Sequence, residues 1–430
     1  MKLGKWIVVA VVLAALFCLP SAVSAKTVGE NMVSPALMVI AQKSAMAKAV
    51  LRGEEIGFEA EDFERALNVS SVTSITVTEL PERTDGILYL GGSEVAVGQT
   101  VTRSNIPYLT FVFASEEITS STFRFSTNLG AYDIACSVYS LAYENRSPVV
   151  SSVSEEIVSV GTYKDVSVYG ILDAYDPDGD ALRYEIVNYP QNGLLVLTDQ
   201  SNGAYRYKPT NGFSGEDGFR YVAVDRYGNY SASVWVSVKV SPSKSALVYE
   251  DLDESKAHVA AIAMTECGVM ASSELDGNYY FNPTTELTRA EFLVMAMKTM
   301  GIQVNAGAQE TVFADNTEIP SEYRGYVNVA QKMGYVCGRL NSDNQLVFCP
   351  NDAITRYEAA AMLYQMCEVG LPVISPVLVD SNTVPSWAKE AVYAMTAAGI
   401  LDGKSGYIAA DSPVTREQAA QMLYKLSSQE

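Results

Sequence analysis

The chain has 430 residues, of which 30 are basic and 50 are acidic, so its formal charge at pH 7 is −20. This length predicts several domains, and an apolar content of 48% excludes a disordered chain. So acidic a chain is not expected to have a nucleic-acid partner, and its single histidine, His258, excludes metal sites that need two histidines.

The first 25 residues have the three-part pattern of a secretory signal peptide. Lys2 and Lys5 precede an apolar run from Trp6 to Leu19, and small residues lead to a predicted cleavage site after Ala25. The run is shorter than the roughly 18–20 apolar residues that a membrane span needs. We therefore expect a secreted protein with no membrane partner after cleavage.

Cleavage would leave an odd number of cysteines, which cannot pair completely within one chain. Cys337 and Cys349 flank a turn-rich loop, so they are either bridged or free. The alternative to a bridge is that all five cysteines left after cleavage are buried free thiols: Cys136, Cys267, Cys337, Cys349 and Cys367.

Residues 26–145 predict an N-terminal β-sandwich module with a leading helix. The segment 33–52 is rich in Ala, Met and Lys, which favours the helix. Short alternating runs follow at 74–80, 86–90 and 109–113, and they are typical of strands.

Residues 146–241 predict a second β-sandwich, of the cadherin-like or immunoglobulin-like kind. Its short strand-like runs, at 157–160, 183–187, 205–207 and 233–238, are separated by Gly, Pro, Asn and Asp.

The two β regions also resemble each other. Four positions of the first region have aromatic counterparts 96 residues later in the second. The counterparts of Leu109, Phe111, Phe123 and Phe125 are, in order, Tyr205, Tyr207, Phe219 and Tyr221. Upstream, residues 86–90 match 193–197 at an offset of 107. This self-similarity predicts one sandwich module used twice.

After a short linker at 241–248, the pattern changes to helices. Helical runs at 257–264, 326–333 and 387–395 each end near a glycine that fits a helix C-cap, namely Gly268, Gly334 and Gly399. A second helix is predicted to start at the threonine of each repeated Thr-Arg pair, namely Thr288, Thr355 and Thr415. A Glu or Gln three residues beyond each threonine completes a capping box.

The capping box does not explain the arginine that follows each threonine. A cation in the first helical turn opposes the helix dipole, at a cost of about 0.3–1 kcal/mol where it is exposed. Arg289, Arg356 and Arg416 therefore predict an anionic or polyhydroxyl partner, held partly by the helix-start amides, or else a salt bridge to an aspartate of a neighbouring repeat.

Further recurring residues extend the repeat. Each copy opens with an aspartate (Asp251, Asp315 or Asp380), and Phe-x-Pro precedes the first two Thr-Arg pairs. With these motifs, 249–430 resembles three consecutive S-layer homology (SLH) repeats, at 249–304, 311–371 and 376–430. The resemblance implies an all-helical, pseudo-threefold unit following the two sandwiches. In the family, this unit binds secondary cell-wall polysaccharide non-covalently, often through a pyruvylated amino sugar, in grooves between repeats.

The resemblance also implies roles for individual residues. Arg289, Arg356 and Arg416 would pair with a ligand carboxylate, while Asp251, Asp315 and Asp380 would bind sugar or brace the groove. Trp387 would pack against sugar, or else within the helical core. Only the third repeat has this tryptophan, the first has Ser272 in place of the second glycine, and the third lacks Phe-x-Pro. The grooves are therefore expected to bind unequally.

The second β region carries an acidic run that predicts either a calcium site or a plain turn with solvated carboxylates. The candidate oxygen ligands are Asp176, Asp178, Asp180 and Asp225. No other cofactor is expected.

Three functions remain open from the sequence. The leading prediction is a non-enzymatic protein anchored to a Gram-positive-type cell wall, displaying its β modules for adhesion or spacing. The alternatives are a subunit of the surface layer that associates with itself, and a wall-associated glycan hydrolase. The acidic residues at 59–64 would supply the hydrolase's paired carboxylates, but they are interpreted as a solvated face.

Overall fold

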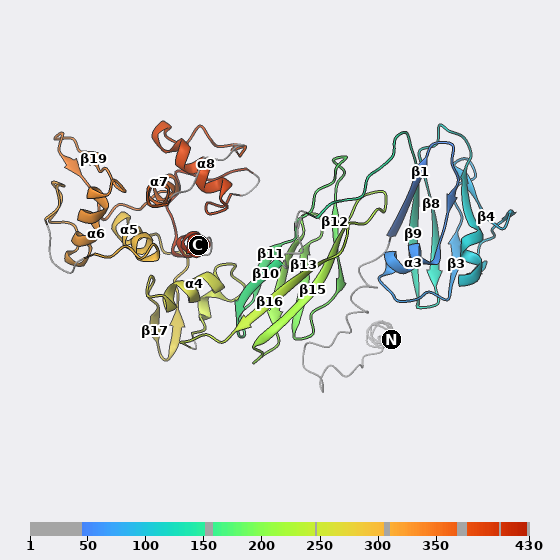
Figure 1. Cartoon of the computed structure of the whole chain (residues 1–430), viewed down its shortest axis with the longest axis horizontal. Helices are drawn as coiled ribbons and strands as arrows, with labels where there is room; N and C mark the ends of the chain where they lie inside the picture. The colour runs from blue at the N-terminus through green and yellow to red at the C-terminus, as the bar shows by residue number, and fades with distance from the viewer. Residues whose placement is uncertain are drawn as a thin grey trace, which may run out of the picture. The chain divides into compact units, whose positions relative to one another are not determined.

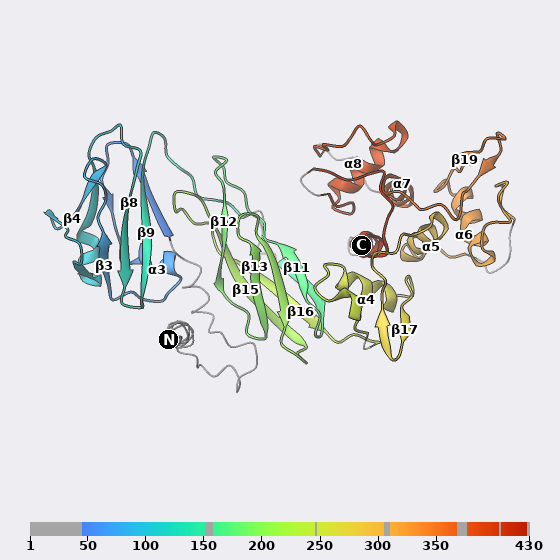
Figure 2. The same cartoon turned by 180° about the vertical axis from the view of Figure 1, so that it is seen from behind.

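The computed structural model describes residues 45–150, 158–245, 247–304, 310–367, 376–403 and 406–427. The predicted signal peptide lies outside them. Contacts divide the chain into two compact units (Figures 1 and 2). One contains both β modules, up to Ser241; the other contains Val166–Val168 and the chain from Pro242 onward.

The first module consists of two sheets, with strand orders β1-β9-β8-β3-β6 and β2-β7-β4-β5. Its elements are β1 (Ala45–Leu51), β2 (Ile56–Gly57), α3 (Ala60–Leu67), β3 (Ser74–Glu79), β4 (Gly86–Leu90), β5 (Ser93–Glu94), β6 (Thr100–Thr102), η1 (Arg103–Tyr108), β7 (Leu109–Phe113), β8 (Ser120–Thr127) and β9 (Gly130–Leu141). Phenylalanines fill the core, where Phe58 meets Phe123 edge-to-face, and Phe63 of α3 meets Phe125 in the same way.

The predicted leading helix is wrong over the residues that the structure describes. Residues 45–51 form β1, which pairs in parallel with β9 from Ala45 opposite Ala135 to Leu51 opposite Leu141. Alanine favours a helix by itself, but pairing along a whole strand outweighs that local preference. The remainder of that prediction, 33–44, lies outside the described residues.

The helix of this module, α3, begins instead in the acidic segment at 59–64. The Asp62 carboxylate accepts a hydrogen bond from the Glu59 amide at 2.8 Å, and Phe63 and Leu67 are buried. Acidic side chains thus occupy one side of a helix whose other side packs into the core.

The second module has strand orders β10-β16-β15-β12 and β11-β14-β13. The strands are β10 (Val158–Tyr163), β11 (Val168–Ile171), β12 (Arg183–Asn188), β13 (Gly193–Asp199), β14 (Ala204–Pro209), β15 (Gly215–Val224) and β16 (Val234–Ser241). Strand β10 pairs in parallel with β16, as β1 does with β9.

The predicted duplication of the sandwich is confirmed by topology. The order β1-β9-β8-β3 in the first module corresponds to β10-β16-β15-β12 in the second, and β2-β7-β4 corresponds to β11-β14-β13. Matched glycines begin β4 and β13. A Cβ on Gly86 would lie 2.4 Å from the Phe111 ring, and one on Gly193 would lie 2.3 Å from the ring of Tyr207, the counterpart of Phe111. Both modules therefore keep one glycine to accommodate the same aromatic ring.

The described residues of the C-terminal unit form three helix pairs. Its elements are η2 (Glu250–Leu252), α4 (His258–Glu266), β17 (Ser273–Leu275), β18 (Asn278–Tyr280), α5 (Arg289–Thr299), α6 (Ser321–Lys332), β19 (Arg339–Leu340), β20 (Leu346–Val347), α7 (Arg356–Met366), η3 (Ser386–Ala388), α8 (Lys389–Ala397) and α9 (Arg416–Ser427). The short β17–β18 and β19–β20 hairpins were not predicted, so the unit is mainly helical rather than all-helical.

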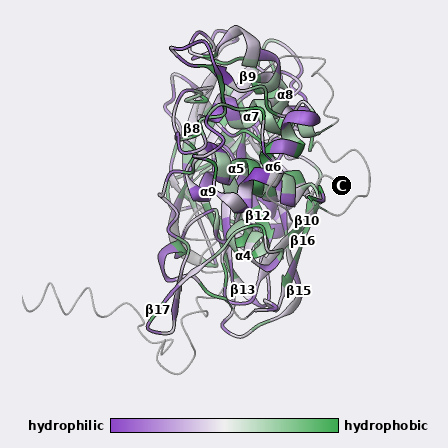
Figure 3. Cartoon of the chain, turned by 90° about the vertical axis from the view of Figure 1, so that its left-hand side faces the viewer, coloured by the Kyte–Doolittle hydropathy of each residue, from purple (hydrophilic) through white to green (hydrophobic). Residues whose placement is uncertain are grey.

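Packing in this unit runs from each repeat to the next. Helix α5 packs against α6, α7 against α8, and α9 returns to α4. Helix α4 is coloured mostly hydrophobic in Figure 3, and most of its residues, including His258, are buried.

The predicted helix ends are confirmed. Thr288 and Thr355 form capping boxes with Glu291 and Glu358. In the third repeat, the Thr415 amide donates to the Gln418 side chain at 3.2 Å. The three predicted C-cap glycines have φ of +70°, +80° and +70°.

Two further findings concern the described residues only. No helix among them combines the length and apolar character needed to cross a membrane. The five described cysteines do not form disulfides with one another, and of these five only Cys136 is buried, so the expectation of five buried thiols is wrong on burial.

Candidate functional site

The three repeats close into a ring through backbone hydrogen bonds at their centre. The Leu287 amide donates to the Val414 carbonyl at 2.9 Å, Val414 donates to Ile354 at 2.9 Å, and Ile354 donates to Leu287 at 3.0 Å. These residues directly precede the three capping threonines. The ring therefore fixes the start of each second helix.

The amides at these helix starts already have partners. Those of Arg289, Arg356 and Arg416 donate to carbonyls of another repeat at 2.9, 3.0 and 2.8 Å. The prediction that the helix-start amides help to hold a ligand is therefore wrong, because each amide has only one proton to donate.

The repeat aspartates brace the loop before each Thr-Arg pair. Asp315 accepts hydrogen bonds from the Phe348 amide at 2.9 Å and the Cys349 amide at 2.7 Å. Asp251 and Asp380 do the same for the corresponding pairs of amides in their own repeats. In each pair, the second residue has a positive φ, which is +58° at Cys349. The carboxylate thus holds a turn that its backbone would not favour alone.

The arginines connect neighbouring repeats. Arg289 Nε donates to the Phe348 carbonyl at 3.1 Å, and the equivalent bonds, Arg356 to Ile408 and Arg416 to Phe281, are 2.7 and 2.8 Å. Burial lowers the pKa of all three guanidinium groups. The braced loop of each repeat therefore presents its carbonyl to the arginine of another repeat.

Only one of the three arginines has a carboxylate within ion-pair distance among the described residues. Arg289 Nη1 lies 3.1 Å from Glu358, and both side chains are 7% exposed. At the equivalent position beside Arg356, the capping residue is Gln418, which carries no charge. A salt bridge to a neighbouring repeat thus exists at Arg289, but its partner is a glutamate rather than the predicted aspartate.

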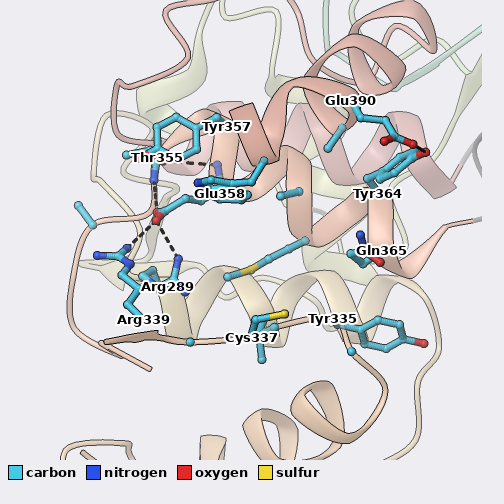
Figure 4. Close-up of a pocket in the computed structure, with 18 residues that line it drawn as sticks. Arg289, Tyr335, Cys337, Arg339, Thr355, Tyr357, Glu358, Tyr364, Gln365 and Glu390 are labelled. Carbon is cyan, nitrogen blue, oxygen red and sulfur yellow. Dashed lines mark hydrogen bonds and ion pairs between the residues drawn. The ribbon is translucent and has the colours of Figure 1, made fainter. Parts of the chain in front are cut away.

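A pocket of about 880 Å³ lies between the second and third repeats (Figure 4). The second repeat supplies most of its lining, the third contributes Trp387 and Glu390, and Arg289 reaches it from the first. Arg289 and Trp387 are thus brought together in one cavity. The other predicted site residues of this unit do not line it: Arg356, Arg416, Asp251, Asp315 and Asp380.

One end of the pocket is a charge cluster centred on Glu358. Its carboxylate lies 2.5 Å from Arg339 Nη2 and 3.1 Å from Arg289 Nη1, and it accepts a hydrogen bond from the Thr355 amide at 3.1 Å. Figure 4 shows the carboxylate between these three donors. Arg339 also lies 3.2 Å from Asp352.

The other end is aromatic. The Trp387 side chain is 64% exposed, and its ring meets that of Tyr357 edge-to-face at 5.7 Å. The Tyr364 hydroxyl donates to Glu390 at 2.8 Å, and Figure 4 shows this pair away from the Glu358 cluster. Of these residues only Trp387 belongs to the repeat motif that the sequence revealed. Arg339, Tyr364 and Glu390 carry no motif signal, and Glu358 was assigned only a capping role.

Three of the four predicted calcium ligands, Asp176, Asp178 and Asp225, bond to other groups of the protein. Asp178 receives the Arg146 guanidinium at 2.6 Å, and Asp225 accepts hydrogen bonds from Asn145 and Asn229. Asp176 accepts from the Asp178 and Asp180 amides, as a turn requires. Within the described ranges, no group of three or more His, Cys, Asp and Glu side chains is arranged to hold a metal ion. Calcium binding stays a prediction.

Known proteins resemble parts of the chain. Of the curated relatives, an endoglucanase of Bacillus sp. (strain KSM-635) is 30% identical over 152 residues, which are 34% of this chain and 15% of that protein. The exoglucanase XynX of Acetivibrio thermocellus is 29% identical over 154 residues, again 34% of this chain and 13% of the relative. The chain therefore spans only a small part of each relative's length.

Solved structures resemble the chain only weakly. Fibronectin(III)-like modules of Clostridium thermocellum CbhA match with 13% identity and a TM-score of 0.20, covering 47% of this chain and 93% of that one. Drosophila N-cadherin EC1-3 matches with 15% identity and a TM-score of 0.21, covering 46% and 65%. Scores this low do not identify a fold.

Two family models match the chain directly. Residues 145–239, which include the second sandwich except the last two residues of β16, match the bacterial Ig domain. Residues 379–420, which include Asp380, Trp387 and Arg416 of the third repeat, match the S-layer homology domain. The chain thus carries a bacterial Ig domain followed by an S-layer homology domain.

Proposed function

We propose that this protein is a secreted, non-enzymatic surface protein that its C-terminal unit anchors non-covalently to the cell wall. All three helical repeats are S-layer homology repeats in this proposal, and their ligand is a secondary cell-wall polysaccharide. The β modules extend from the wall for adhesion or spacing. The observation that carries the proposal is the pocket with the exposed Trp387, in a ring that contains the matched domain.

The curated relatives support an anchoring role over a catalytic one. Three of them are named as enzymes of different kinds, namely an endoglucanase, an exoglucanase and an amylopullulanase, yet each shares a segment of only 152–158 residues with this chain. A segment of similar size in enzymes with different named activities is better suited to attachment than to any one of those reactions.

Sedimentation with purified cell-wall sacculi tests the proposal. The full chain should sediment with intact sacculi, and it should stay in solution when the secondary polysaccharide has been stripped from them. A hydrolase would instead release soluble product from the wall, and a lattice protein would form sheets when concentrated. Equal sedimentation with stripped and intact sacculi would refute the proposed ligand.

The same assay locates the binding activity. The recurring motifs and the pocket all lie after residue 248, so a fragment of residues 26–248 should not sediment with sacculi. If that fragment sedimented as well as the full chain does, the anchor would have to lie in the β modules.

A further inference from the structure

We propose that His258 is a pH-sensitive switch that keeps the first repeat closed against the third while it is neutral and loosens this joint when it is protonated. The inference adds regulation to the proposed function, and it rests on that function where it concerns the wall, because mild acid should then weaken anchoring. Its basis is the burial of His258 and the position of its ring beside the contacts that join the two repeats.

His258 is placed where a positive charge has no partner. It is the single histidine of the chain, and histidine is the side chain whose ordinary pKa lies between about 5 and 8. It is the first residue of α4, it is 7% exposed, and its buried Nε2 atom has no hydrogen-bond partner among the described residues. Protonation adds an N–H donor and a charge at this atom, where nothing compensates for the loss of water.

Burial outweighs the charges of the first repeat around the ring. It lowers the pKa of the imidazole below the usual 6.5, although Asp253, a hydrogen bond with the Leu252 backbone and Asp251 act in the opposite direction. Asp253 is exposed, so water screens it, and the Asp251 carboxylate already accepts two backbone hydrogen bonds, at 2.8 and 2.6 Å. The other charged residues along this segment are exposed: Glu250, Glu254 and Lys256.

The third repeat presents one charge of each sign to this region, from helix α9. Glu417 accepts a hydrogen bond at 3.4 Å from the hydroxyl of Ser255, the residue whose carbonyl accepts the His258 amide. Arg416 is a cation near Tyr249, and it opposes a second positive charge there. These two charges act in opposite directions on a protonated imidazole, so burial remains the main effect.

The imidazole lies beside the contacts that join the first and third repeats. Its ring packs against that of Tyr249, with centroids 6.3 Å apart, and Tyr249 meets the Phe281 ring edge-to-face at 5.4 Å. The Phe281 carbonyl accepts a hydrogen bond from Arg416 Nε at 2.8 Å, and the Arg416 guanidinium lies over the Phe281 ring. If a protonated His258 moves toward water, it disturbs the aromatic rings that hold Arg416.

The direction of the pKa change sets the pH range of the switch. A folded pKa below the unfolded one contributes stability that is complete above the unfolded value of 6.5 and is lost as the pH falls through the folded pKa. The joint should therefore be closed at neutral pH and loosen in mild acid. Asp380 has a pKa below 3.8, so its effect on stability falls at lower pH and does not obscure this one.

Hydrogen–deuterium exchange of the full chain locates the loosening. The Arg416 amide donates from the third repeat to Thr285 of the first at 2.8 Å, and the Arg356 amide donates from the second to Ser412 of the third at 3.0 Å. These amides occupy the same motif position, so Arg356 is the internal control. After correction for the intrinsic effect of pH, exchange at Arg416 should accelerate at least about threefold more than exchange at Arg356 between about pH 7.5 and pH 5.5.

Two variants remove the titration. In His258→Gln the side-chain amide can still bond to the Leu252 backbone, and His258→Phe keeps an aromatic ring beside Tyr249 if glutamine disturbs α4. Circular dichroism verifies that each variant is folded. In both variants, the exchange at Arg416 relative to Arg356 should not depend on pH over this range.

Sedimentation with intact sacculi tests the consequence for anchoring. The parent protein should bind at least about threefold more weakly at pH 5.5 than at pH 7.5, in proportion to the opening of the joint. The sacculi themselves also titrate, so the comparison with His258→Gln and His258→Phe isolates the contribution of His258. Both variants should bind equally at the two pH values.

Each outcome decides the inference. It is overturned if exchange at Arg416 and Arg356 responds alike to pH in the parent protein, or if a folded variant keeps the parent's response. It is also overturned if the joint loosens as expected while the parent binds sacculi equally at both pH values. If the protein sediments with sacculi at neither pH, the proposed function fails, whereas the exchange measurement still decides whether His258 controls the joint.

Discussion

A single capping residue determines the surroundings of each repeat arginine. Glu358 gives Arg289 a buried ion pair, whereas Gln418 leaves Arg356 with carbonyl partners among the described residues. The sequence identified both capping residues correctly but could not reveal this second contact, because the contact crosses from one repeat to another. Local spacing predicts that Glu358 caps its own helix. Its contact with Arg289 of the first repeat exists only once the three repeats have closed into a ring.

Removing Arg289 should therefore destabilise the protein. Arg289→Ala breaks a charged hydrogen bond to Glu358 and another to the Phe348 carbonyl, each at 3.1 Å, so we expect a loss of about 1.5–3 kcal/mol in the free energy of unfolding. The measurement is chemical denaturation of the purified chain. Arg339→Ala is the matched control, because it removes a 42% exposed partner of the same carboxylate and should cost less than about 1 kcal/mol. Equal losses would show that burial does not strengthen the Arg289 contact.

Asp380 should make stability depend on pH in the acid range. Burial raises the pKa of its carboxyl, but hydrogen bonds from the Ile408 and Ala409 amides outweigh this, so the folded pKa lies below the usual 3.8. A depressed folded pKa contributes stability that is complete above the unfolded pKa and is lost as the pH falls through the folded one. The stability advantage over Asp380→Asn should thus be constant above about pH 5 and shrink below pH 4. Denaturant midpoints across this range test the expectation, and parallel pH curves for the two proteins would contradict it.

At the scale of elements, the two sandwiches share a glycine–aromatic contact that is testable in both copies. An alanine Cβ at position 193 would lie 2.3 Å from the Tyr207 ring, and one at position 86 would lie 2.4 Å from that of Phe111. Both rings are fully buried, so neither has space to move. We expect Gly193→Ala and Gly86→Ala each to cost about 1–3 kcal/mol, as overpacking does.

Matched controls come from glycines in other strands of the same modules. Gly161 of β10 and Gly57 of β2 have no atom within 4 Å of an added Cβ and no positive φ. Gly161→Ala and Gly57→Ala should therefore leave the thermal midpoint nearly unchanged. A comparable drop in all four variants would mean that backbone freedom, rather than the aromatic ring, explains these glycines.

Elements with local signals were predicted better than elements that depend on distant partners. Strand β4 matches its predicted run of residues 86–90, and both threonine–glutamate capping boxes formed as expected. Strand β1 was mistaken for part of a helix because its alanines are stabilised by β9, 90 residues away in sequence, as Ala45 opposite Ala135 shows. The hairpins in the first two repeats were missed because strands of two or three residues leave no alternating pattern to detect.

For the molecule as a whole, the sequence identified the repeats but not how they assemble into a site. The Thr-Arg and Asp motifs are local in sequence. They identified the helix starts that the backbone ring fixes and the aspartates that hold the loops before them. The pocket instead combines Arg289 of the first repeat, Arg339 and Tyr364 of the second, and Glu390 of the third. These four side chains come from three repeats, and three of them, Arg339, Tyr364 and Glu390, belong to no repeated motif, so the set becomes visible only when the chain closes on itself.

The two compact units should unfold as separate transitions, each reported by its own tryptophan. Trp235 lies in β16 of the first unit and Trp387 in the second. With Trp6 and either of these replaced by Phe, thermal melting followed by fluorescence isolates one unit. Arg416→Ala removes two hydrogen bonds that join the third repeat to the first, at 2.8 and 2.6 Å, so it should lower only the Trp387 midpoint. Gly193→Ala should lower only the Trp235 midpoint. If either substitution shifted both midpoints together, the chain would unfold as a single cooperative body rather than as two.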